Sequence, residues 1–242
     1  MTGTARRLLG PGLMTAGMLI VLLGLGTWQV KRLFWKEALL AQIDRAEAAP
    51  PVPLPAAPSL PAPFTKVSAT GRLLPDKTAL YGADVRTLPS GPEMGARMIE
   101  AMREADGRVI LVDRGWVPLK RDRPIDEPSG PVTVSGYARP GDSPHWFSVR
   151  DDVPARRFFT LDPKAIGAAI GEPDVPPFVL VILGSGPPPP GGDERVVDHW
   201  PDPARHLPRP PNNHLVYAVT WYGLAVALLA IFVVWARKGS RS

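Results

Sequence analysis

The chain has 242 residues, a formal net charge of +5 and 31 prolines, and it contains no cysteine. The missing thiols exclude disulfides, cysteine-ligated zinc, iron–sulfur clusters and C-x-x-C-H haem attachment, and they argue against copper delivery by thiolates. The basic residues are scattered along the chain, so the charge does not predict nucleic-acid binding. Anionic lipid head groups or the carboxylates of a ligand are better partners for such a surface.

A first hydrophobic stretch covers residues 8–30, carries no charge and follows Arg6 and Arg7. At about 1.5 Å rise per residue it is long enough to cross the hydrocarbon layer. A secretory signal peptide has a shorter apolar core of about 7–15 residues and an early cleavage site. Here, good helix formers continue without a breaker as far as Pro50. We therefore predict a transmembrane helix that continues to about residue 49.

Three residues mark the zone in which this helix leaves the membrane. Trp28, Arg32 and Trp35 are spaced i, i+4 and i+7 and therefore share a helix face. Tryptophan collects at membrane interfaces, where arginine can extend its charged end into water. From spacing alone, an interfacial aromatic belt is the favoured interpretation.

The middle of the chain has the pattern of a β-rich domain between two proline-rich segments. Residues 50–63 hold seven prolines and predict a semi-rigid polyproline II linker, and residues 198–213 form a proline-rich return. Between them, residues 64–197 predict an α+β domain with an antiparallel, barrel-like or sandwich-like sheet. One helix is expected at residues 162–170, with Asp162 as its N-cap. Short apolar runs separated by turn residues predict the strands: 64–73, 78–85, 98–102, 109–117, 132–138, 158–161 and 178–183.

Within this domain, the run VILVDRGWVP at residues 109–118 raises the possibility of an anion site. Arg114 could bind an anion and Trp116 could cover it. The favoured interpretation is structural: the arginine fixes a turn and the tryptophan caps the mouth of a barrel.

Other chemical motifs in the domain are weaker. Met94, Met98 and Met102 have a spacing that would suit a Cu(I) thioether site, although core packing is the better explanation. The histidines outside the last hydrophobic stretch have no partner at metal-ligand spacing: His145, His199 and His206. We find no catalytic constellation and expect that the protein is not an enzyme.

The last hydrophobic stretch predicts a second transmembrane helix over residues 214–236. Asn212 and Asn213 are suitable N-cap residues before it. One face at its start carries an imidazole, two aromatic rings and a small residue, spaced i, i+3, i+4 and i+7: His214, Tyr217, Ala218 and Trp221. On spacing alone this face is again an aromatic belt. A haem ligand is the competing interpretation, because the small residue would leave room for a flat ligand.

The positive charges predict the topology. Basic residues precede the first helix and follow the second: Arg6, Arg7, Arg237, Lys238 and Arg241. Both termini are then expected in the cytoplasm, with the central domain on the outer side. The exit of the first helix and the entry of the second would lie at the same membrane face, so that Arg32 lies at the depth of His214.

Four sequence motifs resemble one family. N-N-H-L-x-Y-A-x-T-W-Y-G-L-A at residues 212–225 is similar to the second-helix signature of the surfeit locus protein 1 family, the cytochrome c oxidase assembly factors of bacteria and mitochondria. G-T-W-Q-V-K-R-L-F-W-K at residues 26–36 resembles its first helix. R-G-W-V-P at residues 114–118 and V-x-V-x-G-x-x-R at residues 132–139 match its central strands.

The resemblance implies a chaperone in the bacterial inner membrane that binds haem a and helps to insert it into subunit I of an aa3-type oxidase. Haem a synthase is a second partner that it suggests. The ligand implied by the family motif is His214. We expect Trp221, about 10.5 Å further along the helix, to pack on the ring and Tyr217 to border it. We also expect Arg32, with Lys31, to pair with the propionates. The alternative is a membrane-anchored scaffold that docks an oxidase subunit without binding haem.

Overall fold

The computed structural model describes residues 3–56, 59–62, 64–88, 90–120, 124–143, 146, 148–184 and 200–239. The chain divides into two compact units. The first, which we call the helix unit, comprises Met1–Asp44 and Arg209–Ser242. The second, the sheet unit, is Arg45–Pro208.

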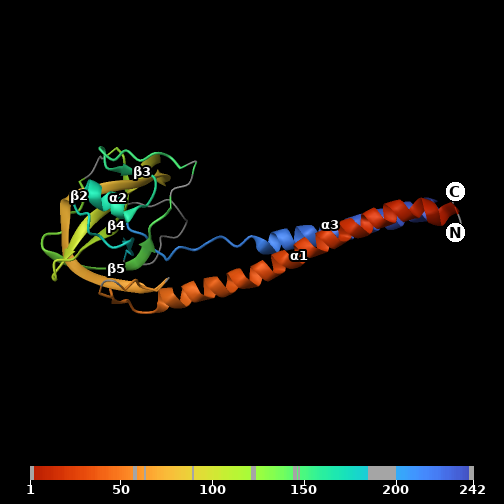
Figure 1. The fold of residues 1–242 in the computed structure, drawn as a ribbon, viewed down its shortest axis with the longest axis horizontal. Coiled ribbons are helices and arrows are strands. Elements are labelled where there is room, and N and C mark those ends of the chain that lie inside the picture. The colour runs from red at the N-terminus through yellow and green to blue at the C-terminus, as the bar shows by residue number, and fades with distance from the viewer. Residues whose placement is uncertain are drawn as a thin grey trace. The chain divides into compact units, whose positions relative to one another are not determined.

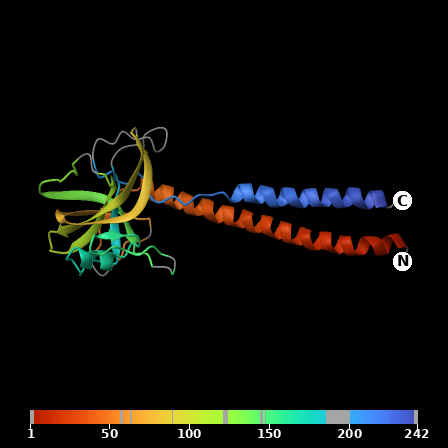
Figure 2. The same ribbon diagram turned by 90° about the horizontal axis from the view of Figure 1, so that it is seen from above.

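Two long helices make up the helix unit, α1 (Gly3–Ala48) and α3 (His214–Gly239). Both are long and apolar enough to cross a membrane. They run antiparallel, because Gly12 near the start of α1 faces Phe232 near the end of α3, while Gly26 faces Tyr222. Figure 2 shows α1 and α3 running alongside each other.

The facing residues of this pair follow a regular spacing. Half-buried and buried positions recur every three or four residues, the pattern of a coiled-coil seam. In α1 they are Gly12, Thr15, Leu19, Leu22, Gly26, Gln29 and Leu33. In α3 they are His214, Ala218, Trp221, Ala225, Leu228 and Phe232. The seam is therefore apolar except at a few neutral polar side chains.

The sheet unit is built around a single mixed sheet of seven strands (Figure 1). Its elements are β1 (Val52–Pro53), β2 (Lys66–Leu88), β3 (Gly91–Glu104), β4 (Val109–Pro118), β5 (Pro131–Pro140), β6 (Arg157–Phe158), α2 (Pro163–Ala169) and β7 (Phe178–Ile182). The strands follow the order β1-β2-β3-β4-β7-β5, and β5 also pairs with the first part of β2.

The prediction of a β-rich α+β domain is confirmed, but the prediction of an antiparallel barrel is not. β7 lies between β4 and β5 and runs parallel to β4. β1 and β6 also pair with β2 in parallel. The unit is a curved mixed sheet and not a closed antiparallel barrel, because β1, β6 and β7 each pair with a neighbouring strand in the parallel direction.

Hydrophobic clusters lie on both faces of this sheet. One includes Ile99, Leu111 and Phe158 and is covered by Ile166 of α2. The other includes Met102, Ile110, Leu180 and the first residues of β2. The predicted cap of α2 is confirmed: Asp162 Oδ1 accepts hydrogen bonds from the backbone N–H groups of Lys164 and Ala165, at 3.0 and 3.1 Å.

Part of the proline-rich segment lies on the sheet. Val52 and Pro53 form β1 beside Val67 and Ser68 of β2, and the N–H of Leu54 donates to the carbonyl of Ser68 at 2.8 Å. An edge strand suits proline, because its missing N–H costs no hydrogen bond on the open side.

Candidate functional site

His214 is the first residue of α3 and contacts two side chains of α1. Its Nδ1 lies 2.7 Å from Oε1 of Gln29. The indole of Trp28 meets the imidazole edge to face, with ring centroids 6.5 Å apart and planes at 85°. Pro210 and Pro211 precede the helix and stop it from starting earlier. The imidazole is therefore held at the seam by a hydrogen bond and a ring contact.

The hydrogen bond to Gln29 determines what the imidazole can do chemically. An amide oxygen is only an acceptor, so the proton of the neutral ring lies on Nδ1. The lone pair then lies on Nε2, the nitrogen through which histidine commonly binds a metal. Metal-bound histidines typically donate their second N–H to an oxygen acceptor in this way.

The predicted companions of His214 lie in different surroundings. Ala218 is only 3% exposed, so the space expected beside the imidazole is not open at that position. Trp221 is half-buried at the seam, whereas Tyr217 is 54% exposed on the outer side of α3. A planar ligand of His214 would therefore have to lie along the outer side of the helix pair.

The predicted belt on α1 is split in a similar way. The guanidinium of Arg32 lies 4.0 Å from the ring centroid of Trp35, and both side chains are exposed. Trp28 instead contacts His214. The spacing pattern placed Trp28 in the belt and predicted no role for Gln29. The position of Gln29 could have indicated a contact with the second helix, because it is a neutral polar residue one turn after Gly26 on the seam face of α1.

These residues fit a haem held by one axial imidazole. Nε2 is the required donor, exposed aromatic side chains lie nearby, and Arg32 could pair with a carboxylate. The fit does not extend to a metal ion held by side chains alone. In the described part of the chain, no group of three or more histidine, aspartate or glutamate residues could hold one.

The R-G-W motif lies inside the sheet unit, where a bulge in β4 leaves Arg114 between the paired residues Asp113 and Gly115. Arg114 is 8% exposed, and its Nη1 lies 2.7 Å from Oε2 of Glu100, which is fully buried. Burial raises the pKa of Glu100, and Arg114 counteracts that rise. The predicted structural role of Arg114 is confirmed, although it fixes a bulge within a strand and not a terminal turn.

Trp116 of the same motif is also fully buried. Its Nε1–H donates to the carbonyl of Asp84 at 3.2 Å, and its ring meets Trp200 edge to face at 5.3 Å. Arg86 stacks on the indole at 5.0 Å and pairs with Asp202 at 2.7 Å. These contacts leave neither side chain of the motif open to a ligand.

The remaining predicted motifs carry no site. Met98 and Met102 are buried in separate hydrophobic clusters, while Met94 is 52% exposed, so core packing is confirmed for the first two. His206 Nδ1 pairs with Oε1 of Glu47 at 2.7 Å. His145 and His199 lie outside the described residues.

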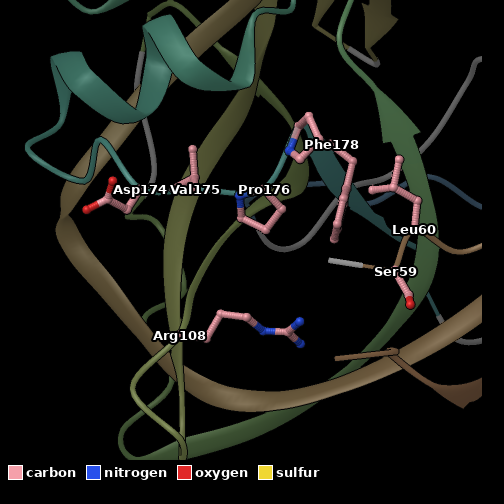
Figure 3. Close-up of a pocket in the computed structure, with 8 residues that line it drawn as sticks. Ser59, Leu60, Arg108, Asp174, Val175, Pro176 and Phe178 are labelled. Carbon is pink, nitrogen blue, oxygen red and sulfur yellow. The ribbon is translucent and has the colours of Figure 1, made fainter. Parts of the chain in front are cut away.

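The sheet unit has two hollows near the start of β7. One, of about 380 Å³, is lined by the proline-rich loop before β7 and by Arg108 (Figure 3). The guanidinium of Arg108 faces this space, but it is already bound to Glu104 and to the carbonyl of Pro55. The other hollow, of about 510 Å³, is largely apolar, and its Arg139 pairs with Asp142 at 2.9 Å. Neither arrangement resembles a catalytic centre.

Sequence comparisons agree with the motifs noted above. The family model described as "SURF1 family" matches residues 16–226. A "SURF1-like protein" of Monosiga brevicollis is 33% identical over 237 residues, covering 91% of this chain and 85% of the relative. A "SURF1-like protein" of Rickettsia felis is 29% identical over 222 residues, covering 90% and 93%. "Surfeit locus protein 1" of Takifugu rubripes is 32% identical over 224 residues, covering 84% and 88%. The match spans both long helices and the sheet unit between them, and the chain therefore belongs to the SURF1 family, known in general terms for cytochrome oxidase assembly.

Proposed function

We propose that this protein is an assembly factor for an aa3-type haem-copper oxidase, and that it binds haem a through His214 and aids its insertion into subunit I. Family membership supports oxidase assembly in general terms. The observation that carries the haem proposal is the Gln29–His214 hydrogen bond of 2.7 Å, which leaves Nε2 with its lone pair. The haem is cargo here, and the proposal assigns no catalytic step to the protein.

Each residue of the site has a separate role in this proposal. His214 supplies Nε2 to the iron, Trp221 packs against the macrocycle and Tyr217 borders it. Arg32, with Lys31 beside it, pairs with the propionates, because carboxylates near an apolar layer need charged partners. Delivery requires release, and one axial imidazole with few charged contacts suits a transient complex. Haem a synthase is then a suitable donor and subunit I the acceptor.

The same proposal places the protein in the bacterial inner membrane, with α1 and α3 crossing it, both termini in the cytoplasm and the sheet unit in the periplasm. The length and composition of the helices and the flanking basic residues support this topology. Alkaline phosphatase is active only outside the cytoplasm. We expect its fusion to either terminus to be inactive and its insertion at the Gly107 turn to be active. Activity of a terminal fusion would overturn the topology.

His214→Ala tests the haem proposal. Full-length protein purified from cells that make haem a should show a Soret band, and the variant should lose most of it while accumulating normally. His206→Ala is the matched control, since His206 pairs with Glu47 in the sheet unit and should retain the band. If His214→Ala keeps a normal spectrum, the imidazole belongs to an aromatic belt. The scaffold function then takes the place of the proposal.

A further inference from the structure

Gln29 is the polar side chain that α1 presents to the imidazole of His214. Both residues are half-buried, and the distance of 2.7 Å between Oε1 and Nδ1 is that of a good hydrogen bond. A neutral imidazole has two tautomers, and only one of them can donate from Nδ1. The contact therefore selects the tautomer whose free lone pair is on Nε2.

The neighbours of Gln29 hold it in place. Gly26 lies on the same face one turn earlier, and a Cβ at that position would lie 2.9 Å from the ring of Tyr222. The hydroxyl groups of Thr27 and Tyr222 are 3.1 Å apart. The close approach at Gly26 brings the two helices together, and the packed pair places the Gln29 amide opposite His214.

An inter-helical hydrogen bond can also be purely structural, since polar groups between apolar helices stabilise their association. The Thr27–Tyr222 bond is an example, because neither hydroxyl touches the imidazole. The bond from Gln29 differs in its partner, which is the ring nitrogen opposite the one that would meet a ligand. Whatever it adds to helix packing, this bond also fixes which ring nitrogen keeps the lone pair.

We infer that Gln29 is a positioning residue for the haem ligand: its amide oxygen holds the proton on Nδ1 of His214 and directs the Nε2 lone pair outward toward the iron of a bound porphyrin. This inference rests on the proposed function. An oxygen acceptor behind a metal-bound imidazole also fixes the plane of the ring and raises its basicity as a ligand.

The tautomer can be measured without haem. Nitrogen-15 NMR of the full chain, labelled on histidine and held in detergent at alkaline pH, distinguishes protonated from unprotonated ring nitrogens. The chain has four histidines, and the spectrum of His214→Ala identifies the signals of His214. We expect protonated Nδ1 in the wild type and in Gln29→Glu, and a shift toward protonated Nε2 in Gln29→Leu. Protonated Nε2 in the wild type would overturn the inference, even if Gln29→Leu failed to fold.

Titration with haem a then separates this inference from the proposed function. Gln29→Leu should bind about 10- to 100-fold more weakly, the usual effect of losing such a partner, and Gln29→Glu should keep wild-type affinity. Thr27→Val is the matched control: it removes an inter-helical hydrogen bond of similar length and should bind normally. If His214→Ala binds as wild type does, the proposed function fails. If His214→Ala loses binding and Gln29→Leu does not, only the positioning role is wrong.

Discussion

The two units differ in the partners that their buried polar groups have. In the sheet unit, buried charges are paired: Glu100 with Arg114, and Asp113 with Arg97. In the helix unit, the polar contacts of the described seam are hydrogen bonds, and the one between Gln29 and His214 is the most buried. A paired charge contributes to folding but is not available to a ligand, because releasing it would leave its partner buried and unpaired.

This difference shows where ligand chemistry can occur. Arg114 and Trp116 belong to the motif of the sheet unit that suggested an anion site from the sequence, yet each is buried and hydrogen-bonded to its own neighbours. His214 uses Nδ1 in its contact with Gln29. Because an imidazole has two distinct nitrogens, the same side chain can pack in the fold and still offer its second nitrogen to a ligand.

The strongest test of this contrast is Arg114→Met. Removing the guanidinium leaves the fully buried carboxyl of Glu100 without its cation, and one-sided loss of a buried pair costs about 3–5 kcal/mol. We expect the sheet unit of the full-length variant to unfold at much lower denaturant concentration, as measured by tryptophan fluorescence in detergent. Haem binding by protein that does fold should persist, since the proposed site lies in the helix unit.

The pH dependence of this variant gives a second measurement. Burial already raises the pKa of Glu100, and loss of Arg114 removes a group that lowers it. The folded state then holds a proton that the unfolded chain releases, so stability falls as the pH rises above the ordinary carboxyl range. The deficit relative to the wild type should be largest near neutral pH and shrink in acid. The control is Arg114→Met combined with Glu100→Gln, which should recover stability; an equal deficit at every pH would contradict the charge argument.

Much of the fold could be predicted from the sequence because its signals are local. The cap of α2 depends only on Asp162 and two N–H groups that follow it. The lengths of the apolar parts of α1 and α3 follow from the hydrophobic stretches of the sequence. The parallel β4–β7 pair was missed because pairing between distant strands leaves no local pattern. β2 was predicted as two strands, 64–73 and 78–85, because the irregular segment between Leu74 and Thr78 looks like a turn in the sequence.

The site could be predicted only in part. Spacing along a single helix placed His214, Tyr217 and Trp221 on one face, the family resemblance suggested a haem role for them, and the expected topology added Arg32 to the candidate site. The contact with Gln29 joins residues 185 positions apart, so no periodicity in either helix predicts it. The burial of Ala218 could not be predicted for the same reason, because it depends on which face of α3 packs in the pair.

A smaller effect is expected from Gly26→Ala, which tests packing in the helix unit as Arg114→Met tests it in the sheet unit. The added Cβ would lie 2.9 Å from the ring of Tyr222, so the ring must move and its contact with Thr27 at 3.1 Å is strained or lost. Overpacking of this kind costs about 1–3 kcal/mol. The helix pair should weaken and the sheet unit should not. The matched control is Gly17→Ala in the same helix, where a Cβ would meet nothing within 4 Å.

The chain has no cysteine, so the helix pair can be labelled cleanly. Leu9→Cys and Val234→Cys place a donor and an acceptor dye at exposed positions toward the Gly12–Phe232 end of the helix pair. We expect energy transfer to be lost at a lower dodecyl sulfate concentration in Gly26→Ala than in the wild type. Gly17→Ala should match the wild type. Equal midpoints for both alanine variants would mean that close approach at Gly26 does not hold the pair together, and that Gln29 must be positioned by some other contact.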